Sequence, residues 1–212
     1  MYVAIEGVIG VGKTTLARLL RPMLEAEILL EIFEENPFLS DFYSDRARYA
    51  FQTQIFFLLS RYHQQRGSVP EMLAAGKSVI ADYTFAKDAL FARINLKGDE
   101  LTVYHRVHEA LGEKTPRPDL IVYLRADTDV LMQRIALRDR SYERNMEREY
   151  IDVLNRAYED FYSEPRPDSP VLGIDTNTLN IVQNPEDLKA VENRIRERLE
   201  LSPFQPSLPM SP

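Results

Sequence analysis

Near the N-terminus the chain reads Gly7-Val8-Ile9-Gly10-Val11-Gly12-Lys13-Thr14, which matches the phosphate-loop pattern of two spaced glycines followed by a lysine and a hydroxyl residue. The context of this stretch also fits. The apolar run 2–6 before it predicts a buried strand, and leucines at helical spacing after it predict a helix. A strand, a glycine loop and a helix N-terminus in this order are typical of a site that binds the phosphates of a nucleotide.

The polar and glycine positions of this loop have distinct expected roles. Lys13 is expected to reach the β- and γ-phosphates, and the hydroxyl of Thr14 is expected to bind Mg²⁺. Glycines let backbone N–H groups curl around phosphate oxygens where a side chain would block them. The expected nucleotide-binding residues are Gly7, Gly10, Gly12, Lys13, Thr14 and Thr15.

The loop alone predicts a nucleotide and leaves the reaction open, because GTPases, motor ATPases and small-molecule kinases share it. The sequence contains no Asn-Lys-x-Asp segment of the kind that reads guanine in regulatory GTPases. A large ATPase would be longer than 212 residues. A compact kinase is therefore the favoured class.

The remaining apolar patterns predict an α/β fold. Short apolar runs at 28–33, 79–81, 120–124 and 171–174 predict further strands, and longer amphipathic stretches between and after them predict helices, including 46–66, 146–162 and 188–199. This alternation predicts a kinase-type parallel sheet of about five strands, with helices on both faces and a phosphate loop. We expect a single domain over 1–201, followed by a Pro-rich, disordered tail at 202–212.

Composition excludes several other classes of protein. The net charge is −7, which argues against a general nucleic-acid-binding protein. The chain has no cysteine, so disulfides, thiolate metal sites and a cysteine nucleophile are excluded. No apolar run approaches the roughly 18 residues of a membrane span, and no secretory signal precedes the first strand. These features together predict a cytoplasmic protein without membrane or nucleic-acid partners.

A kinase also needs a base near the acceptor hydroxyl and a carboxylate near its metal ion. Glu31, Glu34 and Glu35 lie at the end of the predicted second strand, at the edge where sheets of this kind bind ligands, although any one of them alone would more often be a solvated loop acid. Asp82 follows the strand 79–81, a position from which a carboxylate commonly holds Mg²⁺ through water. Asp88 lies further along the chain.

Two more groups of polar residues are candidates for the site. Gln54 and Arg61 are seven residues apart and therefore share one face of the predicted long helix, where they form either packing hydrogen bonds or ligand contacts. A basic cluster between two helical patterns is either a solvated face or a cationic lid over a triphosphate, and we favour the lid. It spans about 138–146 and contains Arg138, Arg140 and Arg144.

Several of these stretches together resemble the deoxynucleoside kinases. The resemblance rests on Ile5-Glu6-Gly7, on Glu31-Ile32-Phe33-Glu34-Glu35-Asn36-Pro37-Phe38, on Phe42-Tyr43 and Phe51-Gln52-Thr53-Gln54, on Leu59-Ser60-Arg61, on Arg117-Pro118-Asp119-Leu120, and on Arg138-Asp139-Arg140-Ser141-Tyr142-Glu143. The matches extend from Met1 to about Tyr162. Ala81-Asp82-Tyr83 and the Glu31-Ile32 pair look most similar to the bacterial deoxyguanosine kinases within this family.

The resemblance implies a reaction and a role for each matching residue. Mg·ATP would phosphorylate the 5′-hydroxyl of a deoxynucleoside, with deoxyguanosine favoured over deoxyadenosine, and the enzyme would be a homodimer. Glu31 would be the base, and Lys13, Arg138 and Arg140 would act on the phosphates. Tyr43 and Glu143 would bind the sugar 3′-hydroxyl, and Asp82 would hold Mg²⁺. The base would be read by Gln54, Arg61 and Asp88, between aromatic walls such as Phe85.

Two residues depart from the pattern of the family. Many members have an arginine directly after the acid that ends the third strand, whereas this chain has Tyr83. Either Lys87 or a lid arginine supplies the missing charge, or the phosphates are handled differently. Asp139 stands where a glycine is more usual, which would stiffen the lid. A nucleoside monophosphate kinase of the thymidylate kinase type and a nucleotide-dependent regulatory module are the alternative functions.

Overall fold

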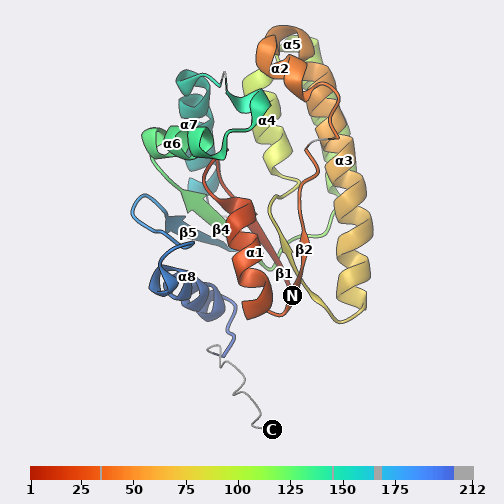
Figure 1. Cartoon of the computed structure of the whole chain (residues 1–212). Coiled ribbons are helices and arrows are strands. Elements are labelled where there is room, and N and C mark those ends of the chain that lie inside the picture. Colours follow the sequence, from red (N-terminus) through yellow and green to blue (C-terminus); the bar gives the residue numbers. More distant parts are fainter. Residues whose placement is uncertain (34, 145, 165–168, 203–212) are drawn as a thin grey trace.

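The computed structural model describes residues 1–33, 35–144, 146–164 and 169–202 (Figure 1). Its sheet has five parallel strands in the order β2-β3-β1-β4-β5. The strands are β1 (Tyr2–Glu6), β2 (Ala26–Leu29), β3 (Ser78–Ala81), β4 (Leu120–Arg125) and β5 (Val171–Asp175). The predicted α/β class and parallel sheet are therefore confirmed.

Helices connect the strands and cover both faces of the sheet (Figure 1). They are α1 (Lys13–Met23), α2 (Leu39–Ser44), α3 (Arg46–Ala74), α4 (Lys87–Asn95), α5 (Gly98–Gly112), α6 (Thr128–Arg138), α7 (Arg148–Ser163) and α8 (Pro185–Arg198), with a 3-10 turn at Ser141–Glu143. No helix in these described ranges is both long and apolar enough to cross a membrane.

The alternation of side chains along β1 divides the core between the two faces. Tyr2 and Ala4 belong to a small buried cluster that includes Val69 of α3. Val3 belongs to the larger cluster, together with Leu16 of α1. Because successive side chains of a strand point to opposite faces, β1 is buried on both sides, as a central parallel strand must be.

The second strand differs from its prediction, because it covers Ala26–Leu29 and not the expected 28–33. The backbone ladder with β3 ends where Leu29 lies opposite Ala81. Two residues later the N–H of Glu31 donates to the Asp82 carboxylate over 2.8 Å instead of to a strand carbonyl. The apolar residues after Leu29 therefore lie outside the sheet, because the hydrogen bond to the Asp82 carboxylate ends β2.

Three helix boundaries also differ from their predictions. The long helix starts at Arg46 as predicted but continues through Pro70 to Ala74, beyond the expected end near residue 66. The last helix starts earlier, at Pro185, because the Asn184 side chain caps it by accepting from the Glu186 N–H. Helix α7 starts at Arg148, just after the expected residue 146. The predicted tail at 202–212 lies outside the described residues except for Ser202.

Candidate active site

A cavity of about 870 Å³ lies at the carboxyl ends of the strands, where β1 runs into the phosphate loop. Parallel α/β sheets bind their ligands at this edge. Most of the predicted site residues line this cavity, which brings together segments far apart in the sequence. They are Gly10, Gly12, Lys13, Thr14, Thr15, Glu31, Tyr43, Gln54, Arg61, Asp82, Arg138, Arg140 and Glu143.

Two glycines give the phosphate loop its shape. Gly12 has φ +107°, and a Cβ atom at this position would have no protein atom within 4 Å, so the side of the loop facing the cavity stays open. A Cβ atom at Gly7 would lie 2.4 Å from the carbonyl oxygen of Leu124. Gly7 therefore serves the packing of the loop against β4, whereas Gly12 leaves space for a ligand to approach the backbone.

The ammonium of Lys13 lies inside the curve of the loop. It donates to the carbonyls of Gly7 and Val8 over 2.7 and 3.1 Å. Burial and the positive charge of Lys87 lower the pKa of Lys13 to about 8. The carboxylates of Glu6, Glu31 and Asp82 act in the opposite direction and do not fully compensate. The pKa of Lys13 therefore reflects the positive charge of Lys87 as well as the negative charges of the three carboxylates.

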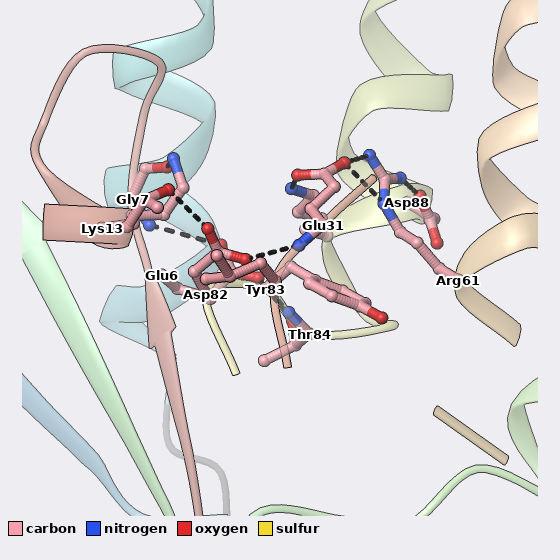
Figure 2. A network of polar contacts seen from close by, with 12 residues as sticks. Glu6, Gly7, Lys13, Glu31, Arg61, Asp82, Tyr83, Thr84 and Asp88 are labelled. Atoms are coloured by element: carbon pink, nitrogen blue, oxygen red, sulfur yellow. Dashed lines mark hydrogen bonds and ion pairs between the residues drawn. The ribbon is translucent and has the colours of Figure 1, made fainter. Parts of the chain in front are cut away.

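Asp82 joins the phosphate loop to the segment after β2 (Figure 2). One of its carboxylate oxygens accepts from the Thr14 hydroxyl over 2.5 Å, and the other accepts from the Glu31 N–H over 2.8 Å. A hydroxyl and a carboxylate in contact form the small, hard oxygen donor set that Mg²⁺ uses when phosphates and water supply its other ligands. Among the described residues, no three acidic or histidine side chains gather into a metal site of their own.

Glu31 lies between two cations at the floor of the cavity. Its Oε1 accepts from Arg61 through Nε over 2.9 Å and also through Nη2, and its Oε2 accepts from Nζ of Lys87 over 2.6 Å. Burial alone would raise the pKa of Glu31, but the charges of Arg61 and Lys87 outweigh it and hold this pKa well below its usual range. Glu31 is therefore an ionised carboxylate in a defined orientation.

Arg61 bridges Glu31 and Asp88, as Figure 2 shows. Its Nη1 forms an ion pair with Asp88, which is fully buried and does not line the cavity. Its guanidinium also lies 4.6 Å from the centre of the Phe57 ring. Asp88 therefore orients Arg61, and a direct contact of Asp88 with the base stays a prediction.

Gln54 lies two helical turns before Arg61 on the same side of α3 and also lines the cavity. Its side chain is 2% exposed, and its Oε1 has no hydrogen-bond partner within the part of the chain that the structure describes. A buried amide oxygen without a partner is costly in an empty protein interior. Its position at a cavity wall indicates an acceptor that a ligand can use.

The predicted lid residues surround Glu143, which is 5% exposed. Arg138 donates to both carboxylate oxygens of Glu143, with Nη2 at 2.7 Å from Oε1 and 2.6 Å from Oε2. Arg140 lies 3.7 Å from the same carboxylate and stacks 4.0 Å from the centre of the Phe33 ring. Tyr43 packs beside them, with its ring stacked on that of Tyr142 at 6.1 Å. The lid residues thus form a connected wall of the cavity.

The outer side of the lid carries its unusual aspartate. Asp139 ends α6 with φ +48°, a conformation that glycine adopts more easily. Its carboxylate accepts from Arg144 at 2.7 and 2.8 Å, and both side chains are more than half exposed. Arg144 therefore pairs with Asp139 on the surface, and it does not line the cavity.

The structure corrects the expected position of Phe85. Phe85 is not a wall of the cavity, because its ring stacks on His108 of α5 at 4.6 Å. The turn after β3 is anchored at Thr84, whose N–H and hydroxyl both donate to Glu6, and this anchor turns the next residue towards α5. Of the three acids after β2, Glu35 is exposed and lies outside the cavity, and Glu34 lies outside the described residues.

The contacts of three residues of the site become clear only in the structure. Lys87 contacts Glu31, Tyr142 stacks on Tyr43, and Glu6 is fully buried where it fixes the turn after β3. The sequence had indicated Lys87 only as one candidate for the charge that is missing at Tyr83, and the structure places it in the first turn of α4. Glu6 had a clearer signal, because a carboxylate at the end of a buried apolar strand needs a partner.

Comparison with known proteins gives consistent results. The family model described as deoxynucleoside kinase matches residues 3–200. The deoxyguanosine kinase of Bacillus subtilis is 34% identical over 199 residues, which cover 92% of this chain and 96% of the relative. The deoxyadenosine kinase of Dictyostelium discoideum is 34% identical over 178 residues, covering 82% and 71%. A solved structure of deoxyadenosine kinase from M. mycoides with bound dCTP has a TM-score of 0.80 and 28% identity, covering 93% of this chain and 100% of that one.

Proposed function

The chain belongs to the deoxynucleoside kinase family, and on this basis we propose that it transfers the γ-phosphoryl group of ATP to the 5′-hydroxyl of a purine deoxynucleoside, with deoxyguanosine preferred and deoxyadenosine second. The observation that carries the proposal is the position of Glu31. Its ionised carboxylate lines the cavity and is held by Lys87 through one oxygen and by Arg61 through the other. Membership of a kinase family disfavours the nucleotide-dependent regulatory module. Because the family is that of the deoxynucleoside kinases, the nucleoside monophosphate kinase is also disfavoured.

The reaction requires one proton transfer and one displacement. Glu31 accepts the proton of the 5′-hydroxyl, and the 5′-oxygen forms a bond to the γ-phosphorus. The bond between that phosphorus and the β–γ bridging oxygen breaks, and ADP leaves with the electron pair. Lys13 stabilises the charge that develops on the departing β-phosphate, because it lies within the loop that cradles the phosphates.

We propose that Thr14 and Asp82 hold Mg²⁺, Thr14 directly and Asp82 through water. When bound, the ion neutralises negative charge on the β- and γ-phosphates. We propose that residues 1–201 form one kinase unit with a lid at 138–146. The proposed phosphate donor is ATP, and the proposed location of the enzyme is the cytoplasm.

The proposed preference for guanine rests on the donors of Arg61 and the acceptor of Gln54. Arg61 carries only donors, and guanine offers O6 and N7 as adjacent acceptors, which arginine favours in base recognition. Gln54 provides a buried oxygen that a base N–H can satisfy. Adenine has an acceptor at N7 and a donor at N6, so it satisfies Gln54 better than Arg61. Relatives named deoxyguanosine kinase and relatives named deoxyadenosine kinase share this family.

We expect a panel of the four deoxynucleosides and guanosine to give steep differences in kcat/KM. Deoxyguanosine should be best, because a mismatched base leaves Arg61 or Gln54 buried without a partner, and such a loss is worth orders of magnitude in discrimination. Guanosine should be poorer than deoxyguanosine, because Tyr43 and the Glu143 carboxylate fixed by Arg138 leave little room at C2′. ADP release measures each rate.

The matched variants are Arg61→Ala and Arg66→Ala, because Arg66 lies on the same helix and is exposed. Arg61→Ala should flatten the ranking of substrates as well as lower the rates, and Arg66→Ala should change neither. A best rate with deoxycytidine or thymidine would exclude the purine assignment. An unchanged ranking in Arg61→Ala would show that Arg61 supports the structure without reading the base.

We expect the affinity for ATP to fall as the pH rises above about 8, the pKa of Lys13 in the free protein. Only the protonated ammonium of Lys13 attracts phosphates. Burial and the charge of Lys87 lower the pKa of Lys13, so the ammonium loses its proton within a pH range that can be measured. The dissociation constant should be flat below about pH 7 and rise roughly tenfold per pH unit well above the pKa, if the neutral form does not bind. A fluorescent ATP analogue titrated across this range tests the expectation, and a constant affinity up to about pH 10 would refute it.

We also propose that the protein is a homodimer that uses the exposed side of α3 and α5. Leu59 of α3 and Val103 of α5 are 40% and 47% exposed, and their two helices contact each other. A dimer interface on these helices would bury both apolar side chains. Sedimentation velocity should show a dimer, and Leu59→Glu should shift it towards the monomer. A monomeric wild-type protein at micromolar concentration would contradict this proposal.

A further inference from the structure

Lys87 is a buried lysine at the first position of α4. It is 4% exposed, and lysines are almost never buried to this extent unless they are paired. Its Nζ donates to Oε2 of Glu31 over 2.6 Å and lies 5.8 Å from the centre of the Tyr83 ring. An ammonium has three donors, and the structure describes one hydrogen-bond acceptor for it. Two donors of a buried cation thus remain for a ligand in the cavity that Lys87 lines.

The fold around the end of β3 places this ammonium beside the reaction centre. Thr84 is tied to Glu6 by its N–H at 2.5 Å and its hydroxyl at 2.8 Å, which fixes the turn between β3 and α4. The hydroxyl of Tyr83 donates to Gln64 of α3, so the Tyr83 side chain is engaged away from the cavity, and it does not line the cavity. The first turn of α4 therefore brings Lys87 to Glu31, and no side chain from Tyr83 fills that space.

Lys87 lines the same cavity as Lys13 of the phosphate loop and Glu31. Cations that line one cavity favour an anion within it. The phosphoryl group that passes from the phosphate loop to a hydroxyl beside Glu31 moves within this cavity.

We propose that Lys87 is a catalytic residue that contacts the transferred phosphoryl group while it holds Glu31. This inference rests on the proposed function, because it takes Glu31 as the base. As the 5′-oxygen bonds to the γ-phosphorus and the bond to the β–γ bridging oxygen breaks, negative charge spreads over the three other oxygens of the phosphoryl group. The two remaining donors of Lys87 stabilise these oxygens, and its third donor keeps Oε2 of Glu31 directed at the same centre.

Lys87→Met tests the charge, because methionine keeps the length and removes the ammonium. We expect kcat for deoxyguanosine to fall about 10²-fold, the usual effect of removing one preorganised donor, while KM for deoxyguanosine changes little. Lys87→Arg should recover part of the rate because it restores the charge. Lys77→Met is the matched control, since Lys77 forms an exposed pair with Glu27 and should leave kcat unchanged. Lys87→Gln replaces Lys87→Met if the latter does not fold by circular dichroism.

A double variant separates phosphoryl contact from an effect through Glu31 alone. In the Glu31→Gln background, Lys87→Met should lower kcat by a further tenfold or so, because the phosphoryl contact remains to be lost. Equal rates for Glu31→Gln and the double variant would overturn the inference and reduce Lys87 to a positioning residue. If Lys87→Met keeps the wild-type kcat while Glu31→Gln is slow, this inference is overturned and the proposed function is not. A wild-type rate in Glu31→Gln would instead overturn the proposed function.

Discussion

Lys13→Ala is expected to lower kcat by at least about 10³-fold with ATP and deoxyguanosine. The ammonium of Lys13 lies within the phosphate loop, where it donates to the carbonyls of Gly7 and Val8. In the transition state it stabilises charge on the phosphates, and alanine offers neither the charge nor the donors. A coupled assay of ADP release measures the loss.

The same variant should remain folded, because only two hydrogen bonds of Lys13 to the loop are lost and the alanine side chain is a good helix former at the start of α1. Circular dichroism and the melting temperature test this point. Lys77→Ala removes a lysine from an exposed ion pair and should keep full activity. Near-normal turnover in Lys13→Ala would mean that the phosphate loop is not the donor site.

Glu31→Gln is expected to lower kcat by roughly 10² to 10⁴-fold, the range for a removed general base. Glutamine keeps the size of the side chain and one oxygen acceptor for Arg61 or Lys87, but it cannot take the proton of the 5′-hydroxyl. Its amide N–H₂ group also faces one of these two cations, which further disturbs the orientation. Single-turnover measurement of phosphoryl transfer separates this loss from changes in nucleoside binding.

Glu35→Gln provides the matched control for Glu31→Gln. Glu35 lies four residues further along the chain, is exposed and does not line the cavity. The kcat of Glu35→Gln should therefore stay within about twofold of the wild-type value. The sequence also predicts a mild effect for Glu34→Gln. A larger loss in either variant than in Glu31→Gln would move the base away from Glu31.

The features that the sequence predicted well depend on neighbours along the chain. A strand, a glycine loop and a helix are contiguous in residues 2–23, so this local pattern predicts both the structure and the binding of nucleotide phosphates. The position of Glu31 in the cavity also follows from its place after a strand in a parallel sheet. Helix α3 started as predicted at Arg46, because Asp45 caps it by accepting from the Arg48 N–H.

The features that the sequence did not predict depend on side chains from distant segments. The end of β2 is set by Asp82, which is far along the chain and takes the Glu31 N–H away from the sheet. The direction of Phe85 depends on the bond between Thr84 and Glu6. The contact of Lys87 with Glu31 depends on both of these arrangements at once, so no local pattern could have selected Lys87 over a lid arginine.

β1 lies in the middle of the sheet and is synthesised before either of its neighbours. Its neighbours are made much later, since Tyr2 lies opposite Val79 of β3 and Val3 lies opposite Leu120 of β4. At a synthesis rate of about 5–20 residues per second, roughly 6 to 24 seconds pass before residue 120 has been made. Until then β1 can pair with β3 only, and its other edge has no strand beside it. A nascent chain thus grows by 106 residues between Thr14 of the nucleotide-binding loop and Leu120 of β4 before both strands that hold the loop in shape begin to be present.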